Sequence, residues 1–141
     1  MERAPRALGA VAALAVLGVA AACTGENYFT GPGLGSTAFE APTIEISAPA
    51  ADAALTQGDS VQVTAAITAA NGVNQITFSG TFIAGTTAYV QRVVSLTGAT
   101  DTTLSRFLQP AGTETGDARI VVQATDLLGN TGADTVLVSV N

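Results

Sequence analysis

Carboxylates are the main side chains that this 141-residue chain could use for acid–base chemistry. The sequence has no His, no Lys, no Trp and a single Cys. This inventory excludes Ser-His-Asp and Cys-His nucleophiles, histidine zinc sites, Schiff-base lysines and P-loops. A carboxylate pair is the one common catalytic device left. Most acids, however, stand beside Gly, Thr, Ala or Asn in apparent turns, where we expect turn and solubilising roles. We assign no catalytic residue and predict that the protein is not an enzyme.

Oxygen-bearing side chains gather toward the end of the sequence. Asp126, Asn130 and Asp134, with Asp117 nearby, offer the carboxylate and amide oxygens of which Ca²⁺ takes about six to eight. The alternative is structural, with Asp126 accepting backbone N–H groups across a turn that contains Gly129 and Asn130. These residues are therefore calcium candidates, and no other cofactor or metal is expected.

Cys23, the only cysteine, directly follows Ala20-Ala21-Ala22. Sixteen uncharged residues, 7–22, precede it and come after Arg3 and Arg6. A charged start, a short apolar middle and a small-residue exit are typical of a secretory signal peptide. The stretch is also shorter than the roughly 20 apolar residues of a bilayer span. We predict that residues 1–22 are a signal peptide that is removed.

The residues that end in Cys23 resemble the lipobox of bacterial lipoproteins, although Ala20 stands where Leu is commonest. The resemblance implies that Cys23 is acylated through its sulfur, becomes the new N-terminus and ties the protein to the membrane. Thr24 stands where the inner-membrane retention signal has Asp, so the outer membrane is expected if the organism has two membranes. Two alternatives stay open. The three alanines also fit an ordinary A-x-A secretion site, and the segment could remain as an uncleaved anchor.

Residues 23–141 have the size of one domain and are acidic. Three arginines stand against ten acids, a formal charge of −7. Three scattered arginines do not build a basic stripe for phosphate backbones, so nucleic-acid binding is excluded. Residues 23–40 carry Gly31, Gly33 and Gly35 around Pro32 without an apolar period, and we predict a flexible tether there.

From Ala41 onward, apolar residues alternate with polar ones in short runs, which is the period of half-buried strands. Asn71-Gly72 predicts a turn between two of them. Arg92 interrupts its run, which indicates an edge strand or a bulge. The register over 87–110 stays open, because either Phe107 or the pair Leu104 and Leu108 could face the core. We expect seven strands, at 43–47, 60–68, 73–82, 89–96, 104–108, 117–126 and 135–141, and hence an all-β, antiparallel two-sheet sandwich over 41–141.

The string ATDLLGN at 124–130, followed by the last alternating strand, resembles the A-x-D-x-x-G-N pattern of bacterial Ig-like domains. Further matching pieces begin at Pro42 (PTIEI), Gly58 (GDSV) and Ile76 (ITF). The resemblance spans 41–141 and implies an Ig-like β-sandwich, with 124–130 in its last hairpin. The Cys, Trp and Cys of antibody domains are absent. Related domains usually occur as repeats in long surface and adhesive proteins, whereas this sequence holds one copy.

These observations predict a non-enzymatic, membrane-tethered Ig-like module of the bacterial cell envelope, for protein–protein contact, adhesion or envelope architecture. Its expected partners are the membrane, through the lipid, and an unidentified envelope or surface protein. An open sheet edge or the loops at one end would make the protein contact. The alternative function is binding of a carbohydrate or another small ligand. Sugar sites favour stacked aromatic rings, and the candidates here are Tyr89, Phe78, Phe82 and Phe107.

Overall fold

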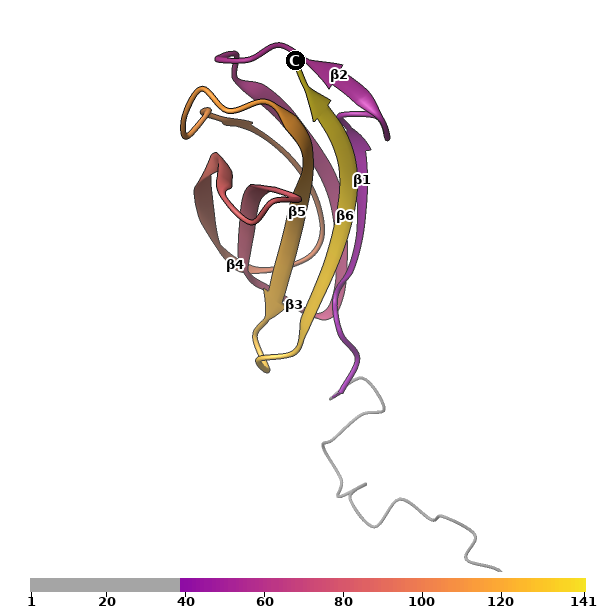
Figure 1. Cartoon of the computed structure of the whole chain (residues 1–141). Coiled ribbons are helices and arrows are strands. Elements are labelled where there is room, and N and C mark those ends of the chain that lie inside the picture. Colours follow the sequence, from indigo (N-terminus) through magenta and orange to yellow (C-terminus); the bar gives the residue numbers. More distant parts are fainter. Residues whose placement is uncertain (1–38) are drawn as a thin grey trace, which may run out of the picture.

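The computed structural model describes residues 39–141, which form six β-strands (Figure 1). Cys23, the predicted signal peptide 1–22 and nearly all of the predicted tether 23–40 lie outside the described residues. Within 39–141, no helix is long and apolar enough to cross a membrane. The strands in chain order are β1 (Thr43–Ala48), β2 (Ala53–Leu55), β3 (Val61–Phe82), β4 (Thr87–Leu108), β5 (Gly116–Asp126) and β6 (Thr131–Val140).

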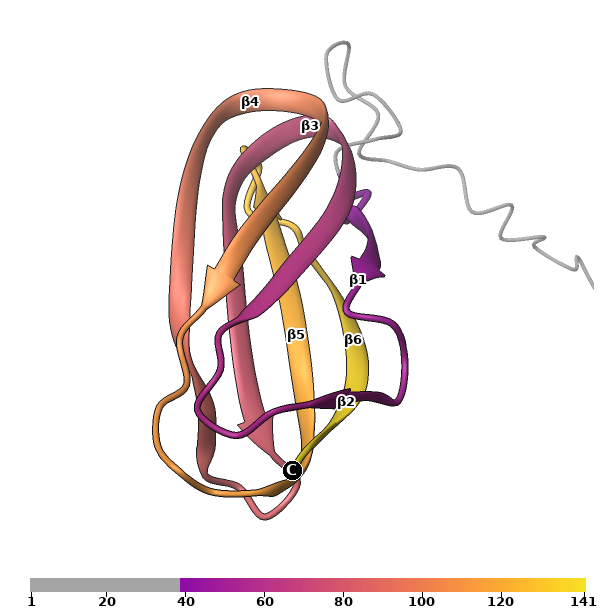
Figure 2. The ribbon, with the colours of Figure 1, turned by 90° about the horizontal axis from the view of Figure 1, so that it is seen from above.

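All six strands belong to one hydrogen-bonded sheet with the order β1-β3-β5-β6-β2, and β4 pairs with β3. Every pairing is antiparallel except that of β2 with β6. The first half of β3 lies between β1 and the end of β4, and its second half lies between β5 and the start of β4. Because β3 and β4 curve together from one layer into the other, the sheet curls over itself (Figure 2). The all-β expectation is confirmed, whereas the expected antiparallel two-sheet sandwich of about seven strands is instead one curled sheet of six strands with one parallel pairing.

The difference arises at the predicted Asn71-Gly72 turn. Gly72 does take a positive φ of 74°, but the chain continues in β3 instead of reversing. Gly98 on β4 has a φ of 89°, and a Cβ added to Gly72 would lie 2.5 Å from the Gly98 carbonyl oxygen. Only glycine permits this conformation and this close approach of two backbones. The two glycines therefore let both strands bend at one level while they stay paired on either side, so four expected strands become two long ones.

Alternating side chains of β3, β5 and β6 build the core, as their sequence patterns predicted. Phe78, Ile76 and Ile120 are fully buried. The other predicted core positions on these strands are also buried: Val61, Val63, Ala65, Ile67, Phe82, Ala118, Val122, Ala124, Val136, Val138 and Val140. Ile44 and Ile46 of β1 pack against this cluster while partly exposed. Burial of these apolar surfaces is the main stabilising term, since the described residues include no cysteine.

Long-range pairing settles the open register over 87–110. Leu108 pairs with Val61 and is fully buried, Leu104 is half-buried, and Phe107 is 58% exposed. The pair Leu104 and Leu108 therefore faces the core. The edge position expected for Arg92 is confirmed, since β3 is the one described strand with which β4 pairs. Arg92 is the register partner of Phe78, and the register of β3 with β4 shifts between Phe78 and Gly80.

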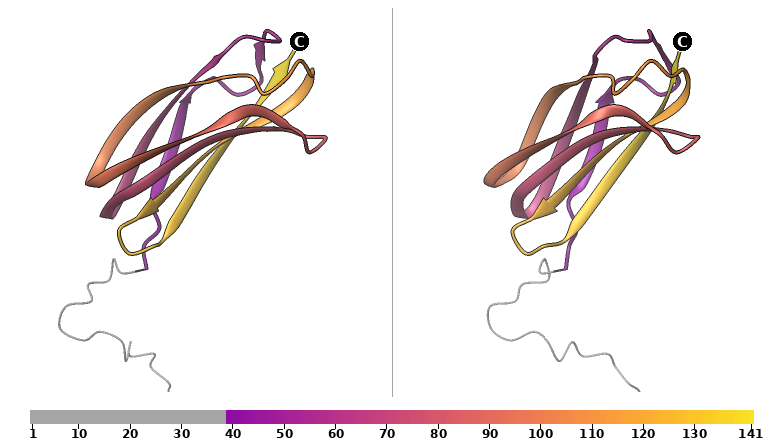
Figure 3. Two further views of the ribbon diagram at one scale, coloured as in Figure 1. Left: turned by 90° about the vertical axis from the view of Figure 1, so that its left-hand side faces the viewer. Right: turned by 60° about the vertical axis from the view of Figure 1, so that its left-hand side comes forward.

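The domain has two distinct ends along its strands (Figure 3). One end, here the proximal end, comprises residues 39–42, Asn71–Gly72, Gly98–Ala99 and Leu127–Asn130, and it is where the described chain begins. The Leu127 N–H donates to the Gly72 carbonyl at 2.9 Å, and a Cβ on Gly132 would collide with the Pro42 carbonyl. The opposite, distal end comprises residues 52–59, which include β2, residues 83–86, residues 109–117, which end in the start of β5, and the C-terminal Asn141.

Candidate functional site

Asp126 ends β5 and is the one charged side chain that is buried among the described residues, with 1% of its surface exposed. Its Oδ1 accepts the backbone N–H groups of Leu128 at 2.9 Å and Asn130 at 2.7 Å. Its Oδ2 accepts the side-chain amides of Asn130 at 2.8 Å and Asn71 at 2.9 Å. Four neutral N–H donors thus surround the carboxylate and stand in for the water that burial removes.

These contacts set the charge state of Asp126. Burial alone raises the pKa of the carboxyl group, because it disfavours the ionised form. The hydrogen bonds from the Asn130 and Asn71 side chains, and those from the Asn130 and Leu128 backbone, outweigh it and place the pKa below its usual value. The group is therefore an anion at neutral pH. It acts as a hydrogen-bond acceptor that fixes the β5–β6 turn and not as a proton donor.

The structure brings together two of the three calcium candidates. Asp126 and Asn130 lie within one turn, where the Asn130 amide donates to the carboxylate. Asp134 is elsewhere on β6, paired in register with Val122, and its carboxylate accepts the backbone N–H of Ile46 at 2.9 Å and of Thr135 at 2.8 Å. Asp117 lies at the start of β5, at the distal end of the domain. Within 39–141, no three His, Cys, Asp or Glu side chains form a group that would hold a metal ion.

Asp134 instead joins two strands that are not paired in the sheet. β1 and β6 lie side by side near the proximal end, and the Asp134 carboxylate accepts the Ile46 N–H. A side-chain acceptor on β6 thus satisfies a backbone donor of the edge strand β1 at the place where the curled sheet meets itself. The sequence pattern alone did not indicate this role.

Three of the four aromatic candidates for a stacked ligand belong to the core. Phe78, Phe82 and Tyr89 are 0%, 8% and 2% exposed, and the Tyr89 ring packs over Gly80. Burial, followed by the nearby charge of Asp59, raises the pKa of Tyr89. Phe107 is exposed but sits apart from these rings on β4. No face of the described domain therefore shows a platform built from the four candidates.

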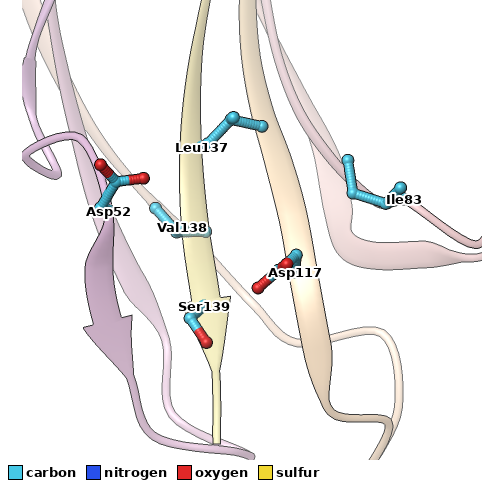
Figure 4. A pocket seen from close by; sticks show the side chains of 6 residues that line it. All are labelled: Asp52, Ile83, Asp117, Leu137, Val138 and Ser139. Atoms are coloured by element: carbon cyan, nitrogen blue, oxygen red, sulfur yellow. The ribbon is translucent and has the colours of Figure 1, made fainter.

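A shallow pocket of about 170 Å³ lies on β6 toward the distal end, and sequence reasoning missed it (Figure 4). Asp117 is the register partner of Ser139, and the Asp52 backbone N–H donates to the Leu137 carbonyl at 2.8 Å. The two carboxylates flank β6 instead of facing each other across a cleft (Figure 4). The pocket is lined by Asp52, Ile83, Asp117, Leu137, Val138 and Ser139.

Two surfaces stand out as possible contact sites. The first is the outer edge of β4, which is paired with Gln109–Ala111 only at its start, through hydrogen bonds of Ala88 and Val90. From residue 91 onward, β4 has a strand on one side alone within the described domain, and Val90 and Val93 are 44% and 52% exposed. The second is the β5–β6 turn, where Leu127 and Leu128 are 57% and 60% exposed. The sequence pattern did not indicate the exposure of these leucines.

Comparison with known proteins agrees with the strand pattern. A family model described as "Bacterial Ig domain" matches residues 42–122, which confirms the resemblance over that range. No curated protein matches the sequence. Among solved structures, the chain is similar to CopC from Methylosinus trichosporium OB3b, with 12% identity and a TM-score of 0.43. The match covers 70% of this chain and 94% of that one.

Proposed function

Since this chain belongs to the bacterial Ig domain family, we propose that it is a non-enzymatic contact module, tethered to the bacterial cell envelope through a lipid on Cys23. The observation that carries the contact role is the open edge of β4. Between residues 91 and 108 this strand presents a long row of backbone groups with a partner on one side only. Such an edge is a template for an added strand from another protein.

The side chains of β4 favour an acidic partner strand. The described domain has nine acids and three arginines, and two of those arginines, Arg92 and Arg106, lie on β4. Asp101 is the only acid on this strand, and it already accepts a hydrogen bond from Thr68 at 3.0 Å. Basic side chains also discourage like edges from pairing, which protects the domain against self-association. The β4 edge is thus the least acidic strand surface of an acidic domain, and it selects partners by charge.

The chemistry of the other candidates supports a binding role over a catalytic one. The buried carboxylate of Asp126 is fully engaged by N–H donors, and Asp134 holds β1 against β6. Asp52 and Asp117 flank a strand in an open, shallow pocket. The acids of the domain therefore perform structural or solubilising work, and the unpaired backbone of β4 is left as its most specific contact surface.

Photo-cross-linking in cells tests this proposal. A photoreactive phenylalanine analogue replaces Val93 on the β4 edge, and in a matched control it replaces Leu137, which is 48% exposed on β6. We expect one discrete adduct from position 93, weakened by Arg92→Glu, and none from position 137. Equal adducts from both positions, or none from position 93, would show that the edge is not the contact surface.

A further inference from the structure

The β5–β6 turn displays two apolar side chains in a fixed position. Leu127 and Leu128 are more than half exposed at the tip of the proximal end, although Leu is usually buried. Their backbone is held firmly, because the Leu127 N–H donates to the Gly72 carbonyl and the Leu128 N–H donates to Asp126. The buried Asp126 network therefore holds the turn in place, where both leucines stay more than half exposed and the Leu127 Cδ1 lies over Gly98 of β4.

The same end is the one nearest to the proposed anchor. The described chain begins there with Phe39, which is 82% exposed, and sixteen residues (23–38) lie between it and the lipid on Cys23. A Gly-rich chain of that length has a root-mean-square span of about 22 Å, and at full extension it reaches at most about 58 Å. A domain on such a short connection stays close to the membrane surface, and its proximal end starts out nearest to it.

The distribution of charge also favours an orientation in which the proximal end faces the membrane. The distal residues 52–59, 83–86 and 109–117 contain four acids, Asp52, Asp59, Glu114 and Asp117, and no arginine. At the proximal end, Asp126 is buried and Glu40 is an exposed acid, while the β5–β6 turn 127–131, which carries the two leucines, has no charged side chain. Anionic lipid headgroups repel the acidic distal end and do not repel the uncharged turn. Moving exposed leucines on an uncharged turn from water into the apolar part of the membrane interface lowers the free energy.

We propose that Leu127 and Leu128 insert into the surface of the membrane that holds the Cys23 lipid, so that the domain stands on its proximal end. This inference rests on the proposed lipid anchor and adds an orientation to it. In this arrangement the strands rise away from the bilayer, and the β4 edge faces sideways, where an envelope protein can reach it. The turn acts as a second, weaker membrane contact beside the lipid.

Tryptophan fluorescence tests the orientation, because the natural chain contains no Trp. The full-length lipidated protein is placed in vesicles of phosphatidylethanolamine and phosphatidylglycerol whose acyl chains are brominated. Leu128→Trp reports on the turn. Ile83→Trp, at a distal position that is 51% exposed, is the matched control. We expect brominated lipid to quench the Leu128→Trp variant at least twofold more than the Ile83→Trp variant, with blue-shifted emission from the Leu128→Trp variant alone.

The outcomes separate this inference from the proposed function. Intact mass of the same sample reports acylation at Cys23, so acylated protein with no quenching in the Leu128→Trp variant would overturn the orientation and leave the anchor in place. Equal quenching of both variants would also overturn it, since the domain would have no preferred end. An unacylated chain would overturn both. In a further variant, Leu127→Ser with Leu128→Ser, acylation should remain, and the protection of Gly129 and Asn130 amides against hydrogen exchange on vesicles should fall to the level seen without vesicles.

Discussion

The Asn71 side-chain amide donates a 2.9 Å hydrogen bond to the Asp126 carboxylate, across 55 residues of sequence. This contact joins the bend of β3 to the β5–β6 turn, and the Leu127 N–H bond to the Gly72 carbonyl runs beside it. The string 124–130 thereby does more than close a hairpin. It locks the proximal end of the curled sheet at the place where the sheet changes layer.

Replacing Asp126 with Asn tests this network. One acceptor oxygen becomes an N–H₂ group that faces existing donors, and the negative charge that four N–H groups solvate is lost. We expect Asp126→Asn to lower the midpoint of urea unfolding by several times the change in Asp101→Asn, whose exposed carboxylate accepts one bond from Thr68. Equal, small shifts for both variants would show that the Asp126 network does not support the fold.

The pH dependence of stability follows from the lowered pKa of Asp126. In the unfolded chain the group takes up a proton near the ordinary Asp pKa of about 3.9, whereas in the folded chain it stays ionised to lower pH. Its contribution is complete above about pH 4 to 5 and declines as the pH falls through the folded pKa. Urea unfolding between pH 7 and pH 2.5 should therefore show a steeper acid loss in the natural protein than in Asp126→Asn. Parallel curves would contradict the assignment.

Gly132 tests the contact between β6 and the start of β1. A Cβ at this position would collide with the backbone carbonyl of Pro42, which cannot rotate away as a side chain can. Gly132→Ala should reduce the free energy of unfolding by about 1–3 kcal/mol, the usual cost of overpacking. Gly112→Ala is the control, since nothing lies within 4 Å of its added Cβ, and it should be neutral or slightly stabilising. Equal effects would place β1 farther from β6 than the structure does.

The same substitution at two phenylalanines tests the core and the register of β4. Phe78 is fully buried, so Phe78→Ala should cost about 3–5 kcal/mol of unfolding free energy. Phe107 is 58% exposed, and Phe107→Ala should change the free energy by less than about 1 kcal/mol. Thermal or urea unfolding measures both. A large loss for Phe107→Ala would mean that Phe107, and not Leu104 with Leu108, faces the core.

Sequence alternation predicted the strands that bury every second residue. The runs from Val61 to Ile67, Ala118 to Ala124 and Val136 to Val140 all face the core as expected. Local signals failed where the outcome depends on a distant partner. Asn71-Gly72 has the composition of a hairpin turn, yet Gly98 approaches it so closely that the chain bends and stays in the ladder. β2 is three residues long and pairs in parallel with the last strand, so it has no period to detect.

In the candidate site, contacts within one turn were predictable from the sequence, whereas contacts between strands were not. The interpretation of Asp126 as an acceptor of backbone N–H groups across its turn agrees with its contacts to Leu128 and Asn130. Its partner Asn71 and the Ile46 partner of Asp134 come from other strands, which no local pattern indicates. The exposure of Leu127 and Leu128 was equally hidden, because a turn of this sequence could have folded its leucines against the core.

We propose that this Ig-like domain is held on the envelope by a lipid on Cys23, and intact-mass analysis checks this attachment. Natural protein and Cys23→Ala are each recovered from the membrane fraction, the soluble fraction and the medium, and are then compared. The account predicts that the natural chain begins at residue 23 and carries the added mass of acyl chains, and that Cys23→Ala has no such mass and leaves the membrane fraction. A natural chain without acyl mass, recovered from the medium, would contradict the tether.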